Sequence, residues 1–175
     1  EVNELLGQQL SEWPQAADNY AALAGVRVKE FDVDGMHFKV QFNPARAVSS
    51  GAKVDAASIK ARKCFLCAEN RPSVQRGIEW NDDYTILVNP FPIFPRHLTI
   101  PCNRHVPQAI EGSVVDMLRL AQELRGYTVF YNGARCGASA PDHFHFQAGN
   151  SDFLPLAANL DGVEMKKLLT HHDST

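Results

Sequence analysis

The spacing of hydrophobic residues predicts two helices and a β-hairpin at the start of the chain. The expected helices cover residues 3–13 and 15–23, and the expected strands cover 26–33 and 36–42. Pro14 separates the helices, and Gly25 ends the second one. Asp34 and Gly35 form the two-residue signal of a tight turn between the strands. We therefore expect an N-terminal helical cap followed by an antiparallel pair of strands.

The rest of the chain predicts an antiparallel sheet with one long helix. Residues 43–63 contain few large apolar side chains and predict a long, mobile loop. Strands are expected over residues 84–89, 97–101, 127–132 and from His143 onward, with a helix over 107–125 and a short one over 163–170. Short turns between successive strands favour antiparallel pairing. We predict an α+β fold in which the long helix packs on the sheet.

The composition indicates one globular domain over residues 1–175. Of the 175 residues, 45% are hydrophobic and 21% are charged, which suits a single full core. The net charge of −3 argues against a nucleic-acid polymer as partner and leaves a small anionic ligand open. No segment reaches membrane-spanning length and no signal peptide is visible, so we expect a soluble, cytoplasmic protein without a membrane partner. Because the first residue is Glu1 and not Met, and the chain ends at residues 171–175 without a closing element, we expect a domain cut from a longer protein, as its N-terminal part.

Two of the four cysteines have the spacing of a metal clip. Cys64 and Cys67 form a CxxC pair, which points to a metal site or a redox pair. The redox interpretation is weaker because the pair does not open a helix in a βαβ unit. A closed tetrahedral zinc site needs two further ligands, and the candidates are His97, Cys102, His105, Cys136 and His143. Cys102 and Cys136 stand alone in the sequence, and each is expected to be a buried small apolar residue.

The segment ASAPDHFHFQAG, residues 138–149, is the main candidate for chemistry. On a strand that starts at His143, the side chains of His143, His145 and Gln147 share one face. A solvated strand face is the alternative. If a metal binds His143, then His145 is available as a nucleophile that attacks the α-phosphorus of a nucleotide. Gln147 can donate a hydrogen bond to a phosphate oxygen but cannot act as an acid or base.

Four ordered motifs resemble those of a known superfamily. They are CFLCAEN, LVNPFP, PRHLTIPCNRH and YNGARCGASAPDHFHFQ, within residues 43–149. Together they resemble the galactose-1-phosphate uridylyltransferase branch of the histidine-triad (HIT-like) superfamily, and HFHFQAG also resembles the GDP-hexose and diadenosine tetraphosphate phosphorylases. The resemblance implies a half-barrel antiparallel sheet and a covalent nucleotidyl-histidine intermediate. Phe146 replaces the glycine of the uridylyltransferases, as it does in the phosphorylase branch.

The resemblance also implies roles for individual residues. His145 falls on the nucleophile and Gln147 on the glutamine that binds phosphate. The residues that match the ligands of a structural zinc ion are Cys64, Cys67, His105 and His143. The residues that match substrate-binding positions are Asn89, Asn132 and Arg46, while Ser139 lies one position away from a phosphate-binding serine. The pattern assigns His97 a mostly structural role.

These residues predict a nucleotidyltransferase or nucleotide phosphorylase. The expected substrates are a nucleotide sugar or a dinucleoside polyphosphate, with phosphate or a sugar phosphate as the acceptor. Because relatives with half-barrel sheets commonly pair, the resemblance also implies a homodimer as a possible assembly. One alternative is a zinc hydrolase in which His143 and His145 both bind the metal and an open position activates water. Another is a catalytically silent nucleotide-binding domain that has kept the fold.

Overall fold

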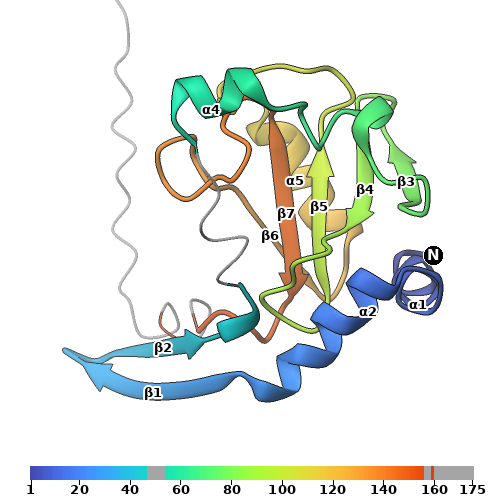
Figure 1. The fold of residues 1–175 in the computed structure, drawn as a ribbon. Helices are drawn as coiled ribbons and strands as arrows, with labels where there is room; N and C mark the ends of the chain where they lie inside the picture. Colours follow the sequence, from blue (N-terminus) through green and yellow to red (C-terminus); the bar gives the residue numbers. More distant parts are fainter. Residues whose placement is uncertain (47–53, 156–158, 160–175) are drawn as a thin grey trace, which may run out of the picture.

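The computed structural model describes residues 1–46, 54–155 and 159 and has a five-stranded antiparallel sheet at its centre. The strands are β3 (Gly77–Trp80), β4 (Tyr84–Val88), β5 (His97–Pro101), β6 (Tyr127–Phe130) and β7 (His145–Asn150). Their order across the sheet is β3-β4-β5-β7-β6, so β7 lies between β5 and β6 (Figure 1). The predicted α+β class is confirmed.

One face of the sheet is covered by α5 (Val114–Glu123) and carries the main core (Figure 1). Leu120 of this helix is fully buried and belongs to the same cluster as Ile100 of β5 and Phe146 of β7. Because side chains alternate along a strand, burial of Ile100 and Phe146 on this face sends Thr99 and Gln147 to the opposite face. The opposite face is therefore the one on which the polar residues of the sheet gather.

The N-terminal helical cap is confirmed as α1 (Val2–Glu12), α2 (Pro14–Ala21) and the 3-10 turn η1 (Ala22–Gly25). Leu5 and Leu6 of α1 bury against Val88 at the end of β4. Gln9 is also buried, where it bonds the main chain of Val74 and Arg76. The cap therefore fixes the segment that leads into β3.

The predicted hairpin forms a separate two-stranded sheet of β1 (Arg27–Val33) and β2 (Met36–Phe42). At its turn, Asp34 and Gly35 have positive φ angles of 52° and 78°, which the right-handed twist of a two-residue hairpin turn requires. Figure 1 shows this pair extending away from the central sheet, beyond the end of α2. The hairpin prediction is confirmed, but these strands do not join the main sheet.

Several elements differ from the prediction. The expected loop over 43–63 contains a short 3-10 turn η2 (Pro44–Arg46) and a helix α4 (Ala56–Ala61), whose first turn is capped by the Asp55 carboxylate bonding the Ser58 amide. The helix expected over 107–125 begins only at Val114, because Gly112 has a φ of +80° that no helix contains. Strand β3 was not predicted, and the helix expected over 163–170 lies outside the described residues.

A further difference concerns the histidine segment, whose strand starts later than predicted. β7 begins at His145 and not at His143, which lies in the turn before the strand. The turn is held by a hydrogen bond from the amide of His143 to the carbonyl of Ala140. His143 and His145 therefore belong to different local structures, and they do not share one strand face as expected.

Across the described ranges, no helix is long and apolar enough to cross a membrane.

Gly149 of β7 is expected to be indispensable for the packing of the sheet. A Cβ atom at this position would lie 2.0 Å from the ring of Phe94, which is itself buried. We predict that Gly149→Ala lowers the free energy of unfolding by about 1 to 3 kcal/mol, measured by urea denaturation. Gly7→Ala is the matched control, because a Cβ atom there meets nothing within 4 Å and the helix should gain about 1 kcal/mol. Equal stability of the Gly149→Ala variant and the wild type would contradict this account.

Candidate functional site

Four side chains from three separate segments meet in a cluster that could hold a metal ion. Their ligand atoms, from Cys64, Cys67, His105 and His143, all lie within 4.8 Å of one another. The two cysteines lie on a tight turn after α4, the knuckle at residues 64–67, whereas His105 follows β5 and His143 precedes β7. These are the four residues that the resemblance implied as metal ligands. His145 is not a member of this cluster.

The distances within the cluster suit tetrahedral coordination. Nδ1 of His143 lies 3.2 Å from Sγ of Cys64 and 3.2 Å from Nδ1 of His105. Metal bonds of about 2.0 to 2.3 Å at tetrahedral angles would place ligand atoms roughly 3.3 to 3.8 Å apart. The arrangement is therefore close to that of two sulfur and two nitrogen ligands around one ion, and among the described residues no further histidine, cysteine or carboxylate joins the group.

The proton positions in the cluster also favour a cation. Nε2 of His143 lies 2.8 Å from the carbonyl oxygen of Cys102, which can only accept a hydrogen bond. The ring therefore carries its proton on Nε2 and directs the lone pair of Nδ1 into the cluster. Burial, followed by the bond from Cys64, raises the pKa of the Cys67 thiol to about 11. A bound cation would supply the charge that the thiolate form needs.

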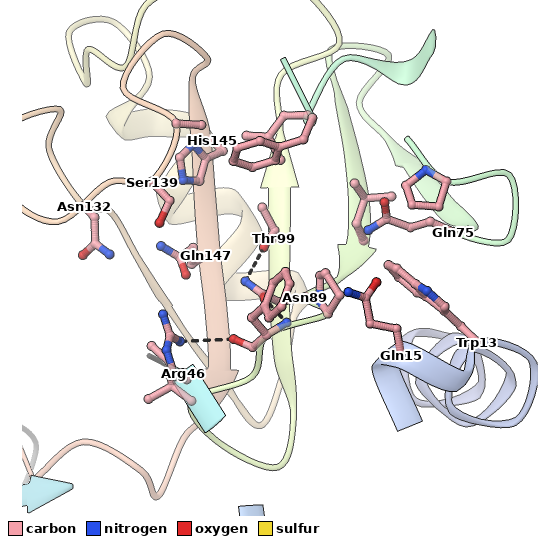
Figure 2. Close-up of a pocket in the computed structure, with 18 of the residues that line it drawn as sticks. Trp13, Gln15, Arg46, Gln75, Asn89, Thr99, Asn132, Ser139, His145 and Gln147 are labelled. Atoms are coloured by element: carbon pink, nitrogen blue, oxygen red, sulfur yellow. Dashed lines mark hydrogen bonds between the residues drawn. The ribbon is translucent and has the colours of Figure 1, made fainter. Parts of the chain in front are cut away.

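The predicted catalytic and substrate-binding residues line one cavity of about 360 Å³ on the sheet face opposite α5 (Figure 2). They are His145, Gln147, Asn89, Asn132, Arg46 and Ser139. His143, by contrast, is not among the lining residues. The structure thus separates the histidine segment into one residue at the Cys/His cluster and two residues at the cavity.

His145 is held as a neutral base with its lone pair available. Its Nδ1 lies 2.8 Å from the carbonyl oxygen of His143, so Nδ1 carries the proton and donates it. Burial lowers the pKa of the ring below its ordinary value, although the bond to His143 opposes this. Nε2 therefore carries a lone pair, and no described residue forms a hydrogen bond with it. A neutral imidazole that presents one lone pair to a cavity is suited to nucleophilic attack.

Gln147 lies beside His145 along β7 and is bonded from behind by a buried histidine. The Oε1 atom of Gln147 is 2.8 Å from Nε2 of His97, at the start of the neighbouring strand β5. Burial lowers the pKa of His97 to about 3, so its ring is neutral at ordinary pH. His97 is not among the residues that line the cavity, and it contacts the carboxamide of Gln147 from behind.

Asn89 and Arg46 are partly committed to the loop between β4 and β5. Asn89 donates from Nδ2 to Oγ1 of Thr99 over 2.8 Å, and its Oδ1 accepts from the amide of Phe91 over 2.8 Å. Arg46 donates to the carbonyl oxygen of Phe91 over 3.1 Å, and burial lowers the pKa of its guanidinium. Both side chains thus shape the proline-rich loop as well as the cavity wall (Figure 2).

Gln108 was not predicted, yet it fixes the backbone of the proposed nucleophile. Its Oε1 accepts from the amide of His145 over 2.7 Å, while its Nε2 donates to the carbonyl oxygen of His145 over 3.0 Å. The same Nε2 also reaches the carbonyl oxygen of Asn132 over 2.9 Å. The carboxamide thus makes the main-chain hydrogen bonds that a neighbouring strand would make, at a point beyond the end of β6. Gln108 has no sequence signal of its own, and it falls inside the helix expected over residues 107–125.

The far end of the cavity was also missed. Trp13 and Gln15, at the junction of α1 and α2, line it together with Gln75 (Figure 2). The cavity therefore runs from a polar end at His145 to an end formed by the N-terminal cap. Only the folded chain brings these residues to β7, because at least 70 positions separate each of them from His145 in the sequence.

The fates of the two lone cysteines differ. All four cysteines lie in the described part of the chain, and none forms a disulfide. Cys102 is buried beside the main core, as predicted. Cys136 is exposed, so the prediction for it is wrong. Cys136 lies in the turn at residues 134–137, where residues 135–137 are all exposed.

Comparison with known proteins places the chain in a family. Residues 5–150 match the model described as "Domain of unknown function (DUF4922)", which covers most of the sequence. The chain belongs to this family. No curated protein matches it.

Solved structures show which fold this member of the family adopts. The yeast Ap4A phosphorylase Apa2 in complex with Ap4A superposes with a TM-score of 0.55 at 19% identity, covering 90% of this chain and 58% of that one. The complex of the same enzyme with AMP gives a TM-score of 0.50 at 19% identity, covering 93% and 56%. The chain thus spans little more than half the length of the enzyme that it resembles. The expected fold, shared with a diadenosine tetraphosphate phosphorylase, is confirmed.

The cluster generates a prediction about metal content. We expect the purified wild-type protein to hold one metal ion, measured by elemental analysis and native mass spectrometry. Cys64→Ser should lose most of it and unfold at a lower temperature, because one of four ligands is replaced by a poor one. Cys136→Ser is the matched control and should keep the metal, because Cys136 lies outside the cluster. Equal metal content in both variants would contradict the assignment.

The buried His97 generates a prediction about pH. Between pH 6.5 and about 3 the unfolded chain binds a proton at His97 that the folded chain does not, so stability falls as the pH falls. This one group should contribute about 1.4 kcal/mol per pH unit in that range. We expect wild type to lose stability between pH 6 and pH 4 more steeply than His97→Gln in urea denaturation. Parallel losses would show that His97 is not buried in its neutral form.

Proposed function

We propose that this chain is the catalytic domain of a nucleotidyltransferase or nucleotide phosphorylase in which His145 forms a covalent nucleotidyl-histidine intermediate. The observation that carries the proposal is the state of His145, a buried, neutral imidazole whose Nδ1 proton is held by the carbonyl of His143. Its Nε2 lone pair is therefore available at the cavity. Gln147 lies on the same face, two residues along the strand.

The first step would transfer a nucleoside monophosphate group to the protein. The Nε2 lone pair of His145 attacks the α-phosphorus, a P–N bond forms, and the P–O bond to the bridging oxygen breaks. The electron pair of that bond leaves with the polyphosphate product, which needs no proton at neutral pH. A carboxamide is adequate beside such a leaving group, because Gln147 can donate a hydrogen bond to a phosphate oxygen without exchanging a proton.

The second step would return the nucleotide to an acceptor. An oxygen of inorganic phosphate or of a sugar phosphate attacks the same phosphorus, so that a P–O bond forms and the P–N bond breaks. The electron pair returns to Nε2, and His145 is again neutral. The bond from Nδ1 to the carbonyl oxygen of His143 stabilises the positive charge that the ring carries between the two steps.

We propose a dinucleoside polyphosphate as the first substrate to test, and a nucleotide sugar as the second. The fold is that of an enzyme whose crystal structures contain Ap4A and AMP. The cavity also offers both kinds of lining that a nucleotide needs. His145, Gln147 and Arg46 suit phosphates, and aromatic or apolar residues such as Phe65, Phe91 and Pro90 suit a base.

We propose zinc as the ion in the cluster of Cys64, Cys67, His105 and His143. Two thiols and two imidazoles in tetrahedral array are a typical zinc donor set. Zinc would stiffen the knuckle against the turn before β7, and its chemistry would be structural, since four protein ligands leave no open position. A hydrolase in which His145 is also a ligand is not favoured, because His145 points to the cavity.

The covalent intermediate can be tested by intact-mass analysis. Wild-type protein incubated with Ap4A and no phosphate should gain the mass of one nucleoside monophosphate group, and later addition of phosphate should remove it. His145→Ala should gain no mass, because it lacks the nucleophile. His37→Ala is the matched control, since His37 lies on the hairpin and outside the cavity, and it should behave as wild type.

The same experiment distinguishes the alternatives. A nucleotide adduct that survives in His145→Ala would place the nucleophile elsewhere and reject the proposal. If neither Ap4A nor nucleotide sugars give an adduct but calorimetry shows that they bind, the chain is a silent nucleotide-binding domain. Because the chain spans little more than half of the similar enzyme, the test should be run on the full-length protein as well.

A further inference from the structure

His97 occupies a rigid position directly behind the cavity. Its side chain is almost completely buried. The ring packs against two aromatic rings, with its centroid 4.6 Å from that of Phe94 and 6.4 Å from that of Phe130. Its carbonyl oxygen accepts bonds from the Tyr20 hydroxyl, over 3.0 Å, and from the Asn89 amide, over 2.9 Å. Neither the ring nor the backbone of His97 therefore has room to reorient.

The two ring nitrogens of His97 have different partners, and one partner decides the role of the other. The main-chain amide of Ile93 lies 3.2 Å from Nδ1 and can only donate a hydrogen bond. Nδ1 must therefore accept, so a neutral ring carries its proton on Nε2. Nε2 lies 2.8 Å from Oε1 of Gln147 and donates to it. The tautomer of His97 is thus set by the backbone of the loop between β4 and β5.

We infer that His97 is a positioning residue that orients the carboxamide of Gln147, so that Gln147 presents its NH₂ group and not its oxygen to the phosphates of the substrate. The inference rests on the proposed function only for the identity of that ligand. The hydrogen-bond relay itself, from the Ile93 amide through His97 to Gln147, is a property of the folded chain.

The orientation matters because the two ends of a carboxamide have nearly the same shape and opposite hydrogen-bonding roles. An NH₂ group facing the cavity can bond a phosphate oxygen, whereas an oxygen there would repel it. With no donor at position 97, the NH₂ group could face the phosphate only if Oε1 were buried without a partner, which is costly. His97 removes this cost before the substrate arrives, which is preorganisation of the site.

The first test reads the relay directly and does not need turnover. Nitrogen-15 NMR of the histidine-labelled full chain should show His97 neutral, with its proton on Nε2. Finding the proton on Nδ1 would overturn the inference, whether or not the protein reacts with any nucleotide. His97→Gln and His97→Met provide the second test, because glutamine can keep an N–H near the Nε2 position and methionine fills similar space without a donor.

The second test measures how fast the nucleotidyl adduct forms in a single turnover with Ap4A. Loss of one oriented hydrogen bond should slow His97→Met about tenfold, and His97→Gln should remain within about threefold of wild type. Both substitutions are then repeated in a Gln147→Ala background. If His97 acts through Gln147, they should have no further effect there. His37→Met is the matched control on the exposed hairpin and should not change the rate.

Each outcome decides one of the two ideas. An equal slowing by His97→Met with and without Gln147 would mean that His97 only supports the fold, and the inference would be wrong. A wild-type chain that forms no adduct would reject the proposed function, while the NMR result would still decide whether His97 orients Gln147. If His97→Met does not fold, His97→Gln in both backgrounds and the proton position still decide the question.

Discussion

The antiparallel pairing of β5 with β7 is the constraint on which the rest of this structure depends. Its register sets Thr99 opposite Gln147, and His97 opposite Gly149. Strand alternation then sends Leu98 and Ile100 into the core beneath α5, while His97, Thr99 and Gln147 face the other way. A shift of one residue would reverse every one of these side chains. The packed core on one face therefore fixes the chemistry of the other.

The two histidines of the HFH sequence differ because the strand begins between them. His143 lies in the turn, where its Nε2–H donates to the carbonyl oxygen of Cys102 and Nδ1 is left to face the Cys/His cluster. His145 is the first residue of β7, where its Nδ1–H donates to the carbonyl oxygen of His143 and Nε2 is left for the cavity. Opposite tautomers of the same side chain are thus set by two main-chain oxygens. The cluster and the cavity are consequently adjacent and still chemically separate.

Burial favours the neutral form of three imidazoles in and around the cavity, and hydrogen bonds then orient each ring. His97, His143 and His145 all have a lowered pKa for which desolvation is the first cause. A neutral imidazole has one donor and one acceptor, so fixing either nitrogen fixes the other. Gln108 and Gln147 extend this arrangement, because each carboxamide is held by groups that can bond in only one sense. Each of these side chains therefore has one orientation that satisfies its partners, and this orders the site.

The sequence by itself determined the elements with strong local signals and the residue types of the site. The Asp34-Gly35 turn, the CxxC pair and the HxHxQ spacing depend on near neighbours, and they could be found by inspection. Tertiary structure alone decided where α5 starts, that Cys136 is exposed, and that His143 leaves the strand face of His145. It also recruited Gln108, Trp13 and Gln75, which have no local signal. The physical reason is that burial and hydrogen-bond partners come from distant segments, so a side chain acquires its role only when the chain has packed.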